Sequence, residues 1–155
     1  MEDRNAYGGV RVIVVSWGSI MGAVTTLHRL IDGAYDYEVI VAIESGGWVP
    51  AKILGSMHKE IRFVNARLVT DTAVSLSGTV DNKRVLIIDD IVDSGKTMGA
   101  VKRWVKQRTP ASIMTASLYT TTKAGAPDFY VNEVNDWVKF PWEHKEEKQV
   151  KTHGT

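Results

Sequence analysis

The stretch from Val85 to Thr97 constrains the fold of this 155-residue chain more than any other part of it. Its first four residues are apolar and three of them are β-branched, which predicts a short buried strand. Two adjacent acids, Asp89 and Asp90, stand at the carboxyl end of this strand, and a turn over 93–97 leads into a helical pattern over 98–105. Because ligands of open α/β sheets bind beyond the carboxyl ends of strands, we expect a binding site here.

The turn and the two acids suit different parts of one ligand. A turn that opens a helix offers free backbone N–H groups to a phosphate. The carboxylates of Asp89 and Asp90 suit ribose hydroxyls or a hard cation such as Mg²⁺. An alternative is that Asp93 or Ser94 only caps the helix. Capping alone does not account for a charged pair at the end of the strand.

Composition sets the broad class of the protein. The chain is 44% hydrophobic and 24% charged, as expected for a globular domain with a normal core. A net charge of +1 gives no reason to expect nucleic acid or a membrane as a partner. Cysteine is absent, which excludes disulfides, thiolate metal sites and a thiol nucleophile. The first seven residues do not resemble a signal peptide, so we expect a cytoplasmic protein.

Outside the 85–105 segment, apolar patterns typical of strands and helices alternate. This order predicts an α/β fold with a mainly parallel sheet and helices on both of its faces. Residues 70–83 have weak periodicity. We expect a single domain over 1–142 and a polar tail over 143–155. Strands are predicted over 10–15, 37–43, 61–68, 112–119 and 129–131, and helices after Ser16 and over 49–54.

The segment Glu44-Ser45-Gly46-Gly47 also follows a predicted buried strand. Two glycines allow close approach of the backbone to a ligand, and their N–H groups can then bind an anion. The spacing fits a tight strand-to-helix turn equally well. Two further residues follow strands or lie near them, Lys123 and Trp137. Taken alone, such a lysine is usually a solvated surface group and such a tryptophan usually packs in the core.

The 85–97 segment resembles the phosphoribosyl-diphosphate (PRPP) signature of the type I phosphoribosyltransferases at every position. The resemblance implies their Rossmann-like fold and a 5′-phosphate cradle formed by Asp93, Ser94, Gly95, Lys96 and Thr97. It also implies that Asp89 and Asp90 bind the ribose hydroxyls directly or through Mg²⁺, and that Asp93 handles the proton of purine N7.

In that family a pyrophosphate loop lies where this chain has residues 44–47, and it often contains a non-proline cis peptide, here expected at Glu44–Ser45. Many relatives have a basic residue where this chain has Ser45. A positive charge at this loop is therefore either absent or supplied by another residue, with Lys52 and Arg67 as candidates. The relatives also have a mobile lid that often begins with a Ser-Tyr pair, whereas residues 66–83 here are short and lack that pair.

Over about residues 10–143 the chain is similar to the xanthine-guanine phosphoribosyltransferases. The similar segments are Lys123-Ala124-Gly125, Asp128-Phe129-Tyr130-Val131 and Trp137 followed by Pro141-Trp142. This implies that Lys123 donates to the 6-oxo group of a purine and that Trp137 stacks on its face. Backbone carbonyls near Trp137 and Val138 would accept from a 2-amino group.

The resemblance therefore implies a pentosyltransferase of purine salvage. It would convert PRPP and guanine, hypoxanthine or xanthine into the nucleoside monophosphate and pyrophosphate, with Mg²⁺ as cofactor. Most relatives assemble as dimers or tetramers, which implies a homodimer or homotetramer. Two alternatives stay open: a phosphoribosyltransferase for adenine or a pyrimidine, and a PRPP-binding regulatory protein without catalysis, which the atypical residues 66–83 suggest.

Overall fold

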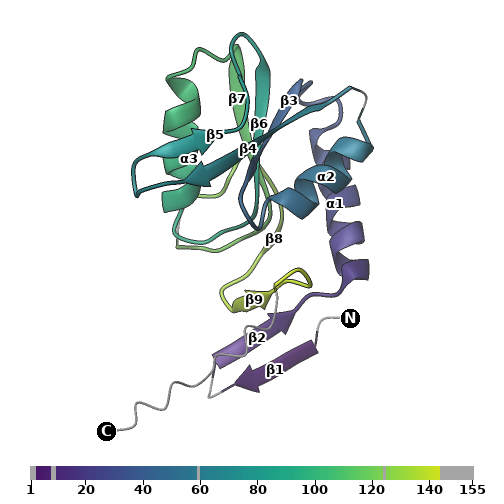
Figure 1. Ribbon diagram of the computed structural model, residues 1–155. Coiled ribbons are helices and arrows are strands. Elements are labelled where there is room, and N and C mark those ends of the chain that lie inside the picture. The colour runs from purple at the N-terminus through teal and green to yellow at the C-terminus, as the bar shows by residue number, and fades with distance from the viewer. Residues whose placement is uncertain (1–2, 8–9, 59, 124, 144–155) are drawn as a thin grey trace, which may run out of the picture.

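The computed structural model describes residues 3–7, 10–58, 60–123 and 125–143 and consists of two sheets and three helices (Figure 1). Most of the predicted tail, 144–155, lies outside these residues. None of the described helices is long and apolar enough to cross a membrane. The helices are α1 (Trp17–Ile31), α2 (Trp48–Ser56) and α3 (Lys96–Lys106). The strands are β1 (Asp3–Tyr7), β2 (Val10–Val14), β3 (Val39–Ile43), β4 (Arg62–Leu68), β5 (Val74–Leu76), β6 (Arg84–Val92), β7 (Ser112–Thr120), β8 (Phe129–Glu133) and β9 (Trp137–Lys139).

The main sheet has six strands in the order β5-β4-β3-β6-β7-β8, and only the edge strand β5 is antiparallel to its neighbour. From β3 the chain continues to β4 on one side, and then returns to β6 on the other side of β3. The strand order therefore reverses between β3 and β6. In open α/β sheets this switch point is where ligands bind.

Helices cover both faces of the main sheet, as predicted (Figure 1). Helices α1 and α2 pack on one face and α3 packs on the other. The central strand β3 is buried along its whole length because both of its faces are covered. Ser16 caps α1, as its sequence suggests, and accepts a hydrogen bond from the Ser19 N–H at 3.1 Å. The predicted α/β class is confirmed.

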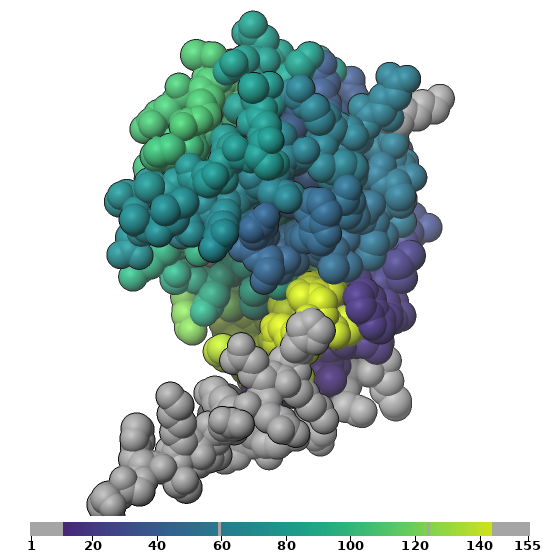
Figure 2. All heavy atoms as spheres, in the orientation of Figure 1, coloured from purple at the N-terminus to yellow at the C-terminus, as the bar shows by residue number. Residues whose placement is uncertain are grey.

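A second sheet of three strands, β1-β2-β9, lies beyond the carboxyl edge of the main sheet (Figure 1). Strand β9 runs parallel to β2, with Trp137 beside Val12 and Val138 beside Ile13. Figure 2 shows the yellow carboxy-terminal segment seated between purple N-terminal residues and the main sheet. This pairing places the β9 segment, distant in sequence, next to the predicted ligand-binding edge.

Several elements differ from the expectations. Strand β6 runs on to Val92, so Asp89 and Asp90 lie within it rather than after it. The short strands β1, β5 and β9 were not predicted, because their pairing partners, rather than their own apolar pattern, specify them.

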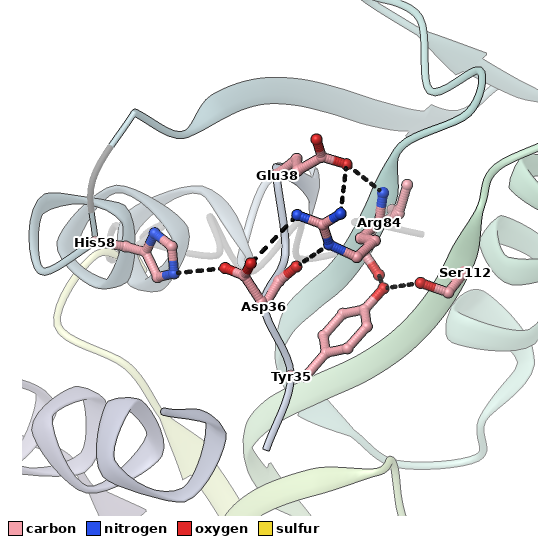
Figure 3. A network of polar contacts seen from close by, with 7 residues as sticks. Tyr35, Asp36, Glu38, His58, Arg84 and Ser112 are labelled. Atoms are coloured by element: carbon pink, nitrogen blue, oxygen red, sulfur yellow. Dashed lines mark hydrogen bonds and ion pairs between the residues drawn. The ribbon is translucent and has the colours of Figure 1, made fainter. Parts of the chain in front are cut away.

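The opposite edge of the main sheet is fixed by a polar network (Figure 3). The guanidinium of Arg84 donates to the backbone carbonyl and the carboxylate of Asp36 and lies 3.7 Å from the Glu38 carboxylate. The hydroxyl of Tyr35 donates to the Val85 carbonyl at 3.0 Å and lies 2.8 Å from the Ser112 hydroxyl. These contacts join the amino ends of β3, β6 and β7, so we assign this network to the stability of the sheet.

Candidate active site

Asp89 and Asp90 lie side by side in β6 at the switch point. The backbone N–H of Asp90 donates to the Asp89 carboxylate at 2.8 Å, and that of Ile91 donates to the Asp90 carboxylate at 2.7 Å. Burial raises the pKa of Asp89 well above its ordinary value, and the charge of Asp90 adds to this rise. Burial also raises the pKa of Asp90, against the opposing effect of its hydrogen bonds. Two carboxyl groups that resist ionisation this close together form a site suited to hydroxyl groups or a cation.

The loop over 44–47 packs directly on these acids. A Cβ at Gly46 would lie 2.5 Å from the Asp90 Cγ. A Cβ at Gly47 would lie 2.8 Å from the Ile43 carbonyl oxygen and closer still to that of Ile88. Gly47 is therefore required for close packing of this loop between β3 and β6, and Gly46 allows the loop to approach the Asp90 carboxyl group. The Glu44–Ser45 peptide bond is cis, as predicted.

The candidates for a charge near this loop have different surroundings. The Lys52 ammonium lies 4.4 Å from the ring centroid of Trp48 and 4.0 Å from that of Phe63. It is thus already engaged with two aromatic faces. Arg67 is exposed near the carboxyl end of β4, on the same edge of the sheet as residues 44–47. Its placement leaves it available to an anion at this edge.

The turn after β6 forms a small pocket at the start of α3. This pocket, of about 110 Å³, is lined by Asp89, Ile91, Val92, Asp93, Ser94, Gly95, Thr97 and Met98. The N-cap residue of α3 is Gly95, whose φ of 80° favours glycine. No side-chain hydrogen bond caps the helix from this position. The alternative that Asp93 or Ser94 serves as the N-cap is therefore wrong. The Lys96 N–H donates to the Ser94 hydroxyl at a long 3.4 Å, and no side chain caps the helix from the Gly95 position, so N–H groups of this turn are left for a ligand.

A second cavity, of about 340 Å³, adjoins the acids on the side of β9. The Lys123 ammonium lies 3.3 Å from the Asp93 carboxylate at its wall. Trp137 also lines this cavity and is 67% exposed, so the interpretation of this residue as part of the core is wrong. The structure thus brings together Asp93, Lys123, Trp137 and Val138, as the resemblance implied. Ala124 lies outside the described residues.

The residues at this cavity that were not singled out from the sequence include Thr121, Asn135, Phe140 and Glu143. Burial and the charge of Asp90 raise the pKa of Glu143. Phe140 stacks on Trp142 at 4.9 Å between ring centroids, which supports the cavity floor. The run of threonines before Lys123 could have indicated Thr121, since threonine hydroxyls often form hydrogen bonds with neighbouring backbone groups.

The segment over 66–83 forms a small hairpin rather than a long loop. Strand β5 pairs with the end of β4, and the backbone N–H of Val69 donates to the Ala73 carbonyl at 2.8 Å. The Thr70 hydroxyl accepts from the N–H groups of Thr72 and Ala73. The tip of this hairpin and the start of α3 line one cavity, of about 670 Å³, which includes Leu68, Asp71 and Arg103.

Comparisons with known proteins decide the family. Residues 18–149 match the model of the phosphoribosyl transferase domain family. The chain belongs to this family. A xanthine-guanine phosphoribosyltransferase of Idiomarina loihiensis is 30% identical to it over 151 residues, which cover 86% of this chain and 88% of the relative. One of Gluconobacter oxydans is 36% identical over 125 residues, or 67% of each chain.

A solved structure agrees with this assignment. The crystal structure of a purine phosphoribosyltransferase from Pyrococcus horikoshii matches with a TM-score of 0.79 and 27% identity, over 86% of this chain and 94% of that one. The predicted membership in the phosphoribosyltransferases, and the similarity to their xanthine-guanine branch, are confirmed.

Proposed function

We propose that this phosphoribosyltransferase transfers the phosphoribosyl group of PRPP to a 6-oxopurine, giving the nucleoside monophosphate and pyrophosphate. One observation carries the proposal. The Asp93–Lys123 ion pair and the exposed face of Trp137 converge on a cavity that adjoins the phosphate pocket at the start of α3. The names of the relatives, xanthine-guanine phosphoribosyltransferases, support the same base class.

The sugar phosphate occupies the pocket on β6 and the start of α3. The 5′-phosphate accepts hydrogen bonds from the backbone and hydroxyl groups of the turn over 93–97. The N–H groups of the loop over 44–47 bind the pyrophosphate. Asp89 and Asp90 hold the ribose hydroxyls.

The acidic pair also fits Mg²⁺. Two adjacent carboxyl groups whose pKa values are both raised by burial gain most from a bound cation. The missing side chain of Gly46 lets the loop over 44–47 pack directly against the Asp90 carboxylate, which holds the loop backbone beside the acidic pair. We therefore assign Asp89 and Asp90 as the residues that would hold Mg²⁺, which would supply charge stabilisation to the leaving pyrophosphate.

The purine occupies the larger cavity. Lys123 has only donors, so it matches a 6-oxo group and not the 6-amino group of adenine. A base without the oxo group leaves the ammonium without its acceptor, which lowers affinity for that base. Trp137 stacks on the purine face. Backbone carbonyls at Trp137 and Val138 accept from a 2-amino group, which favours guanine.

The reaction exchanges one bond at the ribose C1′, and side chains of this protein assist that exchange. The bond from C1′ to pyrophosphate breaks as the purine N9 bonds to C1′, through a transition state with oxocarbenium character. The Asp93 carboxylate takes the proton that purine N7 loses as N9 becomes bonded. The remaining rate enhancement comes from positioning and charge stabilisation.

Pyrophosphate release, measured with PRPP, Mg²⁺ and guanine, hypoxanthine, xanthine or adenine in turn, tests the proposal. We expect turnover with the 6-oxopurines and little with adenine, and Lys123→Ala should erode that discrimination. A wild-type protein that prefers adenine or a pyrimidine would refute the assignment of the base. PRPP binding without release from any base would favour the regulatory alternative.

The resemblance also supports a cytoplasmic homodimer or homotetramer. Trp17 and Met21 expose 53% and 47% of their surfaces one turn apart on α1, which suits a contact between subunits. Light scattering in solution measures the number of subunits, and a monomer at working concentrations would contradict this part of the proposal.

A further inference from the structure

Thr121 is buried directly after β7, between the two residues that the proposed function assigns to the purine edge. Its side chain is 5% exposed. Its hydroxyl lies 2.9 Å from the Asp93 carbonyl oxygen and 3.1 Å from the Asp93 carboxylate, and it donates its single proton to these two acceptors. The same oxygen accepts from the backbone N–H of Lys123 at 3.3 Å. One buried hydroxyl thus contacts both neighbours.

Asp93 needs such a contact because its own surroundings do not fix it. The side chains of Asp93 and Lys123 are 55% and 66% exposed. An exposed ion pair of this kind contributes only about 0–1 kcal/mol, too little to hold two mobile side chains in one arrangement. A hydrogen bond from a buried hydroxyl to a charged group is stronger, and its donor is held in place by the sheet.

The position of the Thr121 hydroxyl is fixed because β7 is hydrogen-bonded to β6 as far as this residue. The N–H of Thr121 donates to the Val92 carbonyl at 3.0 Å, and the Thr120 hydroxyl lies 3.3 Å from the same carbonyl oxygen. The Thr121 hydroxyl therefore moves with the main sheet, whereas Asp93 and Lys123 belong to the loops that follow it.

We propose that Thr121 is a positioning residue that holds the Asp93 carboxylate beside the Lys123 ammonium, so that both meet adjacent atoms of the purine. This inference rests on the proposed function. The Asp93 carboxylate receives the N7 proton only from the correct orientation, so loss of the hydroxyl slows the chemical step and leaves the phosphate pocket intact. Thr121 acts through Asp93 and does not itself exchange a proton with the purine.

Thr115 provides a matched control on the same strand. It is also 5% exposed, its hydroxyl donates to the Asp128 carboxylate at 3.1 Å, and it accepts from the Asp128 N–H at 3.1 Å. Its bonding pattern thus repeats that of Thr121. Six residues along a strand place it about 20 Å from the purine cavity. Thr115→Val should therefore cost stability without a change in kcat.

The test measures kcat and KM for guanine and PRPP in the wild type, Thr121→Val, Thr121→Ser and Thr115→Val. We expect Thr121→Val to lower kcat about 10–100-fold, the effect of losing one hydrogen bond to a charged group. The KM for PRPP should stay within about twofold, and Thr121→Ser should recover most of the kcat. If Thr121→Val does not fold, Thr121→Ala replaces it under the same criteria.

A double-mutant cycle separates positioning from a general structural effect. In an Asp93→Asn background, Thr121→Val should lower kcat further by less than about threefold, because the residue that it positions is already disabled. Equal losses in both backgrounds, a failure of Thr121→Ser to rescue, or a kcat for Thr121→Val within about threefold of wild type would overturn the proposal. Absence of guanine turnover in the wild type would instead remove the proposed function, and this inference with it.

Discussion

The two glycines of the loop over 44–47 should respond differently to the same added methyl group. At Gly47 the Cβ would meet backbone carbonyl groups of β3 and β6, which cannot move without displacing the centre of the sheet. Overpacking of this kind costs about 1–3 kcal/mol, and rigid neighbours favour the upper part of that range. At about 2–4 °C per kcal/mol for a domain of this size, Gly47→Ala should lower the Tm by about 4–12 °C.

At Gly46 the atoms nearest to the Cβ would be those of the Asp90 carboxyl group, a side chain that can rotate, unlike the backbone. We therefore expect Gly46→Ala to leave the Tm within about 2 °C of wild type. The displaced carboxylate no longer binds the sugar, so kcat/KM for PRPP should fall about 10–150-fold, the effect of one lost hydrogen bond to a charged group.

Thermal unfolding and pyrophosphate release on the two variants check this difference. Gly22→Ala is the matched control, because a Cβ there meets nothing within 4 Å on an exposed part of α1. In this helix interior, alanine should raise the free energy of unfolding by about 0.5–1 kcal/mol and leave kcat unchanged. The reasoning fails if Gly46→Ala keeps full kcat/KM for PRPP, or if it loses as much stability as Gly47→Ala.

Three further predictions concern single side chains. Asp93→Asn should lower kcat about 10²–10⁴-fold with little change in PRPP affinity, and near-normal turnover would exclude Asp93 from proton transfer. Trp137→Ala should raise the KM of every 6-oxopurine about equally, by roughly 5–150-fold for a lost stack of about 1–3 kcal/mol, and should leave the Tm unchanged because the ring is exposed; a selective loss for one purine would count against stacking. The pKa of Asp89 is raised in the fold, so stability is lost as the pH rises from the ordinary pKa of the unfolded carboxyl up to the raised pKa, and Asp89→Asn should raise the Tm at pH 7. That gain should vanish below about pH 4, where the carboxyl is protonated in both states, and a gain independent of pH would contradict the buried-carboxyl explanation.

The sequence predicted the part of the site that is local in the chain. An apolar run, two acids and a turn within 85–97 specify β6, the phosphate pocket and the start of α3, because each depends on neighbours a few residues away. The glycine pair at 46–47 was open to two interpretations until its packing between β3 and β6 was known. The resemblance to relatives, rather than any pattern of its own, indicated that loop.

The rest of the site depends on contacts that a single sequence does not reveal. Trp137 reads as a core residue in isolation, and its exposure follows from the three-residue pairing of β9 with β2. Thr121 is one of three consecutive threonines, and nothing in that run distinguishes its hydroxyl from those beside it. Glu143 stood at the boundary of the predicted tail, yet it lines the purine cavity.

The parallel pairing of β2 with β9 also has a consequence for how the protein acquires its selectivity. Residues 39–120 contain the sugar-phosphate half of the site on one continuous segment, whereas the base half requires a contact between remote parts of the sequence. Contacts of such wide separation form late, and small peripheral sheets open at lower free energy than a central one. During synthesis and in native-state hydrogen exchange, recognition of the purine should therefore behave as a separate cooperative unit, which is completed after the phosphate pocket and lost before it.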